Sequence, residues 1–142
     1  MKFLVQNTIP ATVFATKKWL GKSPRGLAFL TNNMDLFEIE NHGENHIPAV
    51  IGLGRKVYGI AGEPDILHLR REVQEGARAI EGATGVAPHW YRGATAEYDP
   101  QAGDEIRPMG ARIAVVSVNA EVGASMNEFT TVERLRRVPR GA

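Results

Sequence analysis

Short β-prone segments alternate with helical segments along this chain, and that order constrains the fold more than any other feature. Residues 65–82 predict the longest helix, because apolar side chains recur there at helical spacing between Asp65 and Gly82. Strands that alternate with helices favour a parallel sheet in an α/β fold. The predicted strands are residues 11–16, 36–40, 88–92 and 112–118, the last of them a buried strand.

The remaining segments are predicted to be shorter helices and loops. Residues 17–32 favour a helix that Pro24 interrupts, and residues 125–139 favour a last short helix. Residues 47–64 are rich in glycine and contain two prolines, which predicts a long connecting loop. Loops longer than about 12–15 residues are often functional.

The length of the chain limits how such a sheet can close. The 142 residues suit a single domain over residues 1–142, whereas a complete (β/α) barrel needs roughly 200–250 residues. A formal net charge of +1 gives no basic field for nucleic acid, and the absence of cysteine excludes disulfides and thiolate chemistry. We find no apolar run of the ~20 residues that a membrane span requires. The N-terminus also lacks a signal-peptide core, so as written the chain is expected to be cytoplasmic.

Two histidines follow the strand at residues 36–40. Catalytic side chains in α/β folds gather at the carboxyl ends of strands, which here selects the loop after Ile39, the turn after Tyr91 and residues 119–121. His42 and His46 are four residues apart, and two imidazoles at this spacing can meet one metal ion in a tight loop. From spacing alone, two surface histidines are the commoner interpretation.

Two groups of arginines each allow a functional and a structural interpretation. Arg92, at the end of a strand, can orient a carboxylate or contact an anionic transition state, or else form an ordinary surface ion pair with Glu97 or Asp99. The C-terminal arginines favour a solvated helix end over a nucleic-acid contact. They are Arg134, Arg136, Arg137 and Arg140.

The order of these pieces resembles the polysaccharide deacetylase family, the NodB-homology domain of family-4 carbohydrate esterases. The chain has Ile-Pro-Ala-Thr-Val-Phe at 9–14, then Glu-Ile-Glu-Asn-His-Gly-Glu-Asn-His at 38–46. A helix ending in Ala-Ile-Glu-Gly-Ala-Thr-Gly at 79–85 then leads to the strand that carries Arg92. Residues 119–124 look like a variant of the next family motif.

The resemblance implies a distorted (β/α) barrel that removes acetyl groups from carbohydrates with one divalent metal, expected to be zinc. His42 and His46 match the two metal-binding histidines of the family, and Arg92 matches the arginine that orients the catalytic base. Thr95 falls where the family supplies an oxyanion-stabilising amide, and Glu121 stands where the family has an aspartate. The implied partner is an acetylated carbohydrate, with neither nucleic acid nor a membrane span involved.

The chain departs from the family pattern at both ends. It lacks the Thr-Phe-Asp-Asp-Gly motif, which supplies the base and the third metal ligand, and the final Leu-x-His motif, which supplies the acid. We therefore expect a partial barrel without its first and last strands, with Glu40 or Glu44 as possible substitute ligands. Exposed sheet edges predict a homo-oligomer. The alternative function is an inactive carbohydrate-binding or interaction module. Family members are often exported.

Overall fold

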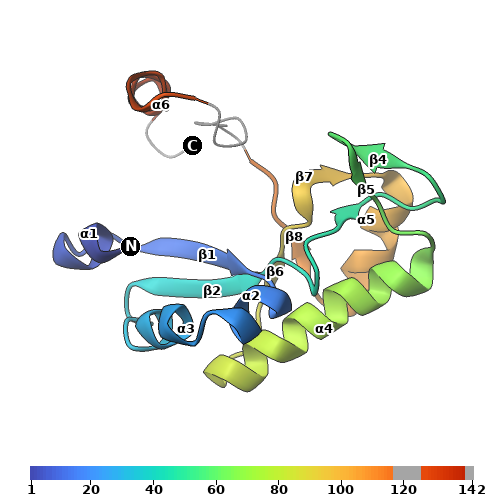
Figure 1. Cartoon of the computed structure of the whole chain (residues 1–142), viewed down its shortest axis with the longest axis horizontal. Coiled ribbons are helices and arrows are strands. Elements are labelled where there is room, and N and C mark those ends of the chain that lie inside the picture. The colour runs from blue at the N-terminus through green and yellow to red at the C-terminus, as the bar shows by residue number, and fades with distance from the viewer. Residues whose placement is uncertain (117–125, 140–142) are drawn as a thin grey trace.

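A four-stranded parallel sheet forms the centre of the protein, with the strands in the order β1-β2-β6-β8. The structure is a computed structural model that describes residues 1–116 and 126–139 (Figure 1). Within the sheet, Ala11 of β1 pairs with Phe37 of β2, and Ala15 pairs with Asn41. The strands are β1 (Ala11–Ala15), β2 (Phe37–Asn41), β6 (Trp90–Tyr91) and β8 (Arg112–Ile113).

Helices connect the successive parallel strands. Between β1 and β2 lie α2 (Lys17–Lys22) and α3 (Pro24–Thr31), and between β2 and β6 lies α4 (Ile66–Thr84). From β6 to β8 the chain passes through α5 (Pro100–Ile106) and a 3₁₀ turn (Arg107–Met109). The predicted α/β fold with a parallel sheet is confirmed. The sheet stays open, with β1 and β8 at its edges, as a partial barrel requires.

The long helix α4 begins and ends where its capping residues predict. The Asp65 side chain accepts a hydrogen bond from the backbone N–H of His68 at 2.9 Å. At the other end Gly85 takes the left-handed conformation with φ of 74°, which glycine adopts without steric cost. The predicted helix over residues 65–82 is therefore confirmed, with two further residues at its end.

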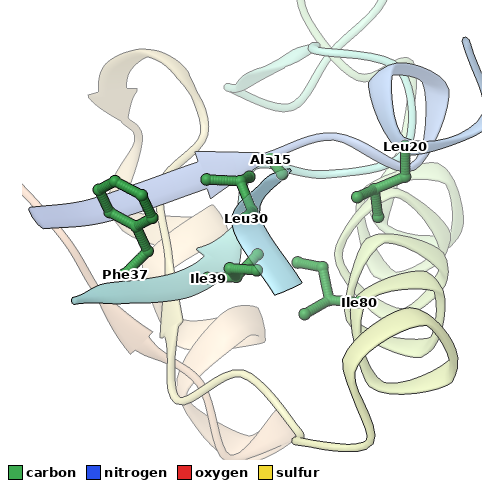
Figure 2. Packing of buried hydrophobic residues seen from close by; sticks show 6 residues of the cluster. All are labelled: Ala15, Leu20, Leu30, Phe37, Ile39 and Ile80. Carbon is green, nitrogen blue, oxygen red and sulfur yellow. The ribbon is translucent and has the colours of Figure 1, made fainter. Parts of the chain in front are cut away.

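Helix α4 packs against two separate hydrophobic clusters. Ile80 belongs to the first, which fills the space between β1, β2 and the helices α2 to α4 (Figure 2). Leu69 and Val73 belong to the second, together with Tyr91 and Ile106. The first cluster consists of Ala15, Leu20, Leu30, Phe37, Ile39 and Ile80. One amphipathic helix thus supports both halves of the molecule.

The prediction of one long loop over residues 47–64 is wrong. This segment contains β3 (Pro48–Ala49) and a hairpin of β4 (Lys56–Val57) and β5 (Ile60–Ala61). β3 pairs in parallel with β7 (Ala94–Tyr98), a strand that we did not predict. The strands β3, β4 and β5 have two residues each, too few to show a two-residue periodicity, and glycines dominate the turns around them. The five-residue strand β7 pairs with β3 in an irregular register.

The predicted buried strand over residues 112–118 is also wrong in its described part. Only Arg112 and Ile113 pair in the sheet, because β6 offers just two residues for them to pair with. Val115 is 70% exposed, so the β-branched run continues beyond the sheet without being buried. Residues 117 and 118 lie outside the described part of the chain.

The other predicted helices are confirmed in outline. The helical stretch over residues 17–32 is split at Ser23, because Pro24 begins a new helix at its first position. The last helix is α6 (Glu128–Arg136), where Asn127 accepts from the N–H of Thr130 at 2.9 Å. A short helix α1 (Lys2–Gln6) precedes β1. Over residues 1–116 and 126–139, no helix combines the length and the hydropathy that crossing a membrane would require.

Candidate active site at the carboxyl ends of the strands

The carboxyl ends of β1, β2 and β6 lie level with one another. Ala15 pairs with Asn41, and Asn41 pairs with Tyr91. The next residues continue this alignment, because the N–H of His42 donates to the Ala15 carbonyl at 3.0 Å and the N–H of Arg92 donates to the Asn41 carbonyl at 2.8 Å. The loop after β2 therefore meets the turn after β6 at one edge of the sheet.

The two predicted histidines face one another. The imidazole rings of His42 and His46 lie edge to face, with their centroids 4.6 Å apart and an angle of 71° between the planes. His42 is half-buried, and its Nδ1 bonds the carbonyl oxygen of Arg92. Because a carbonyl oxygen can only accept, Nδ1 must carry the proton, which leaves Nε2 with a free lone pair.

Burial favours the neutral form of the His42 imidazole, which is the form that binds metal ions. Desolvation lowers the pKa of His42 below its usual value, the bond to the Arg92 carbonyl opposes this shift, and the neighbouring His46 adds to it. A neutral imidazole whose other nitrogen donates to a backbone carbonyl is the usual arrangement of a metal-ligating histidine.

A pocket of about 500 Å³ opens in front of the two histidines. Its walls come mainly from the end of β1 and from the start of α2. Mostly apolar walls with a small number of polar side chains are typical of small-molecule sites. The lining residues are Val13, Phe14, Ala15, Thr16, Trp19, His42 and His46.

Arg92 lies at the same edge as the histidines and does not form the surface ion pair that we considered. Its guanidinium carbon lies 5.9 Å from the centre of the Phe14 ring, a cation–π contact with a residue of the pocket wall. Asp99 instead pairs with Arg55 at 2.7 Å. Among the described residues, no ion pair includes Arg92, so its charge faces the site without a carboxylate partner.

The loop of residues 42–47 is fixed on α4 by a buried carboxylate that sequence reasoning missed. Glu72 accepts hydrogen bonds from the backbone N–H groups of Asn45 and Ile47, and it is 2% exposed. His46, between those two residues, has a φ of 70°. A glutamate on the buried face of α4, three residues after Leu69, was the available signal, because a carboxylate is rarely buried without partners.

The two glutamates proposed as substitute ligands are engaged elsewhere. Glu44 forms ion pairs with Lys17 at 2.7 Å and with Arg71 at 3.2 Å. Glu40 is buried and accepts from the backbone N–H of Trp90 at 2.7 Å. Within residues 1–116 and 126–139, no group of three or more His, Cys, Asp or Glu side chains could hold a metal ion. Of the predicted ligands, only His42 and His46 therefore lie side by side in the described part of the chain.

The turn that carries Thr95 has an unusual backbone. Thr95 and Ala96 have φ values of 70° and 55°, in the left-handed region that residues with a Cβ seldom adopt. The Thr95 hydroxyl oxygen is buried without a hydrogen-bond partner. Nearby, the N–H of Gly93 donates to the Tyr98 hydroxyl at 2.9 Å. The oxyanion role expected for Thr95 stays a prediction. Glu121 and residues 119–124 lie outside the described part of the chain.

Two further buried acidic groups, Glu63 and Tyr91, interact electrostatically with Glu72. Burial raises the pKa of Glu63 to about 7, with the nearby Glu72 carboxylate adding to the shift. Burial also raises the pKa of Tyr91 well above its usual value, again with Glu72 contributing. One carboxylate oxygen of Glu63 and the Tyr91 hydroxyl have no hydrogen-bond partner.

Comparison with known protein families gives one match over most of the chain. The model of the family described as polysaccharide deacetylase matches residues 1–114. No curated protein matches the chain.

Solved structures with similar folds come from several bacteria. A CE4 family pseudoenzyme from Bacillus anthracis has a TM-score of 0.74 at 18% identity, over 96% of this chain and 43% of that protein. A family 4 carbohydrate esterase from Streptomyces lividans, in complex with acetate, has a TM-score of 0.74 at 17% identity, over 96% and 64%. The peptidoglycan deacetylase PdaC from Bacillus subtilis has 0.72 at 18% identity, over 96% and 59%. The chain thus spans less than two thirds of the length of each.

Proposed function

The chain belongs to the polysaccharide deacetylase family, and from this premise we propose that it serves the metal-dependent hydrolysis of acetyl groups on a carbohydrate. The observation that carries the proposal is the pair of facing imidazoles of His42 and His46 at the carboxyl end of the parallel sheet. Their positions coincide with the histidines of the family motif in the sequence.

His42 and His46 would hold a divalent metal, with zinc as the expected ion because imidazole nitrogen suits it. The chemistry supplied by such a metal is Lewis-acid activation of water and of the acetyl carbonyl, so no protein nucleophile is required. His42 can bind through Nε2, because its Nδ1–H is already committed to the Arg92 carbonyl. That bond also ties the ligand to the strand end that carries Arg92.

The remaining roles follow from charge and position. In the proposed reaction, water adds to the acetyl carbonyl carbon and the carbon–nitrogen bond breaks, giving acetate and a free amine. Arg92 places an unpaired positive charge beside Phe14 at the pocket wall, where it can orient a carboxylate or the acetyl group. The backbone near Thr95 would donate to the developing oxyanion.

The test is the deacetylation of an acetylated chito-oligosaccharide in the presence of zinc, measured as the acetate released. Because this sequence lacks the motifs for the base, the third metal ligand and the acid, we expect at most weak activity in the wild-type chain, and the loss of that activity in His42→Ala. His89→Ala is the matched control, because His89 is exposed and precedes the opposite end of β6. Zinc binding without acetate release would favour the inactive carbohydrate-binding module instead. An His42→Ala variant as active as the wild type would overturn the proposed site.

The expected homo-oligomer remains a proposal of the same kind. Its support is that β1 and β8 are the edge strands of the central sheet, and unpaired edges are prone to association.

A further inference from the structure

Glu72 is a buried carboxylate whose hydrogen bonds all go to the loop that carries His46. Its Oε1 and Oε2 accept from the backbone N–H of Asn45 at 2.9 and 3.0 Å, and Oε1 accepts from the N–H of Ile47 at 3.2 Å. The side-chain amide of Asn45 also donates a long hydrogen bond to Oε2, at 3.5 Å. The two backbone donors belong to the residues immediately before and after His46, so Glu72 holds both of its neighbours.

The cationic side chains near Glu72 pair with other carboxylates, so Glu72 is bound by the N–H groups of the loop. Lys17 pairs with Glu44 and Glu75, and Arg71 pairs with Glu44. Among the described residues, no ion pair includes Glu72. Hydrogen bonds from N–H groups to a carboxylate are short and directional, so they fix the orientation of the donors as well as stabilising the loop.

Two glycines bring the loop into direct contact with the helix. A Cβ at Gly43 would lie 2.4 Å from the Glu72 Oε1, and a Cβ at Gly76 would lie 2.2 Å from the Asn41 Oδ1. Asn41 in turn donates from its side chain to the Val73 carbonyl at 2.8 Å and accepts from the Gly43 N–H at 2.8 Å. The loop thus lies directly against the helix, and the hydrogen bonds of Asn41 hold it there.

The backbone of His46 requires such support. Its φ of 70° lies in the left-handed region, which residues with a Cβ adopt only when their surroundings compensate for the strain. The direction of the His46 side chain depends on this backbone angle. We propose that Glu72 is a positioning residue that sets the His46 imidazole against that of His42. The inference rests on the proposed function for the metal, but its first test does not.

The first test uses the metal-free chain. We expect the amide protons of Asn45 and Ile47 to exchange slowly with solvent in the wild type, as slowly as the amides within α4. In Glu72→Gln, where one oxygen becomes an NH₂ group that cannot accept, we expect their exchange to accelerate at least about tenfold. The matched control is Glu75→Gln, on the same helix, because Glu75 bonds only the side chains of Lys17 and Arg78.

The second test measures zinc affinity of the folded fraction by isothermal titration. Loss of a group that orients a metal ligand typically costs 10–100-fold in affinity, so we expect Glu72→Gln to bind zinc about 10–100-fold more weakly than Glu75→Gln. A purely structural role would lower the stability of Glu72→Gln and leave the zinc affinity of its folded fraction unchanged, which would overturn the inference.

The outcomes separate this inference from the proposed function. If the wild-type chain binds no zinc, the proposed function fails, and the amide exchange still decides the role of Glu72. If Glu72→Gln does not fold, the wild-type exchange rates decide alone. Amides of Asn45 and Ile47 that exchange as fast as the exposed Gly54 amide would contradict the inference, and protected ones would support it.

Discussion

The two loops that meet at the candidate site are held in opposite ways. The histidine loop, residues 42–47, is held by the buried side chains of Asn41 and Glu72, whose hydrogen bonds go mainly to backbone groups. The second region differs, because three buried side-chain oxygens there have no hydrogen-bond partner. One lies in the arginine turn, residues 92–98, one at the end of the strand before it, and one on a carboxylate that interacts electrostatically with that strand end. They belong to Glu63, Tyr91 and Thr95, and they are the only such side-chain atoms among the described residues.

This difference teaches which half of the site is preorganised. A metal ligand must be held in one geometry before the metal arrives, and a fully hydrogen-bonded loop provides that. Left-handed backbone occurs in both regions, at His46 in the first and at Thr95 and Ala96 in the second. In the second it comes together with unpartnered buried groups, and both features cost stability. Substitutions in the first loop should therefore be costly, whereas suitable ones in the second should stabilise the protein.

The largest effect is expected for Gly76→Ala in the helix below the histidine loop. The new Cβ would lie 2.2 Å from the Asn41 Oδ1 and 2.7 Å from the Gly43 carbonyl carbon, so the loop backbone must move. Overpacking of this kind costs about 1–3 kcal/mol, and we expect the upper end, measured by urea unfolding.

Gly82→Ala is the matched control for this substitution. A Cβ at Gly82, in the same helix, would meet nothing within 4 Å. It should stabilise the protein by up to about 1 kcal/mol through helix propensity. Equal effects at the two positions would show that the loop does not rest on α4 as described.

The next largest effect concerns the charge of the buried Glu63 carboxyl group. Its pKa is raised from 4.5 to about 7, so the folded state retains a proton that the unfolded state has already lost. This contribution to stability is present in full below pH 4.5 and is lost as the pH rises through about 7. Glu63→Gln cannot ionise, so it should be more stable than the wild type at pH 8, on the order of 2–3 kcal/mol.

The measurement is the free energy of unfolding of both proteins from pH 4 to pH 8. The exposed Glu97→Gln should keep the wild-type dependence. A Glu63→Gln variant whose stability falls with pH as steeply as that of the wild type would contradict the assignment.

The smallest effect tests the backbone of the arginine turn. Left-handed backbone costs a residue with a Cβ roughly 1–2 kcal/mol, and glycine avoids most of this cost. Because Ala96 has a φ of 55°, we expect Ala96→Gly to raise the melting temperature, with a gain of about 0.5–1 kcal/mol. Ala94→Gly should have the opposite effect, since Ala94 is fully buried and absent from the left-handed residues. If both variants destabilise equally, the turn is not strained.

The elements that could be predicted from the sequence are those with a periodic apolar pattern or a recognisable motif. Helix α4 has five turns of amphipathic pattern between Asp65 and Gly85, and the histidine spacing points to one loop. The hairpin of β4 and β5 was missed because strands of two residues leave no periodic signal. The five-residue strand β7 was missed because it pairs irregularly with the distant strand β3. Glu72 escaped for a similar reason, since its role is visible only when the loop lies against the helix.

The most direct test of the account is zinc binding by the whole chain, measured by isothermal titration against the His42→Ala/His46→Ala double variant. We predict one zinc ion per wild-type chain, no binding above background in the double variant, and unchanged binding in His89→Ala. A wild-type chain that binds no zinc, or a double variant that binds it as well as the wild type does, would contradict the claim that these two imidazoles form the metal site.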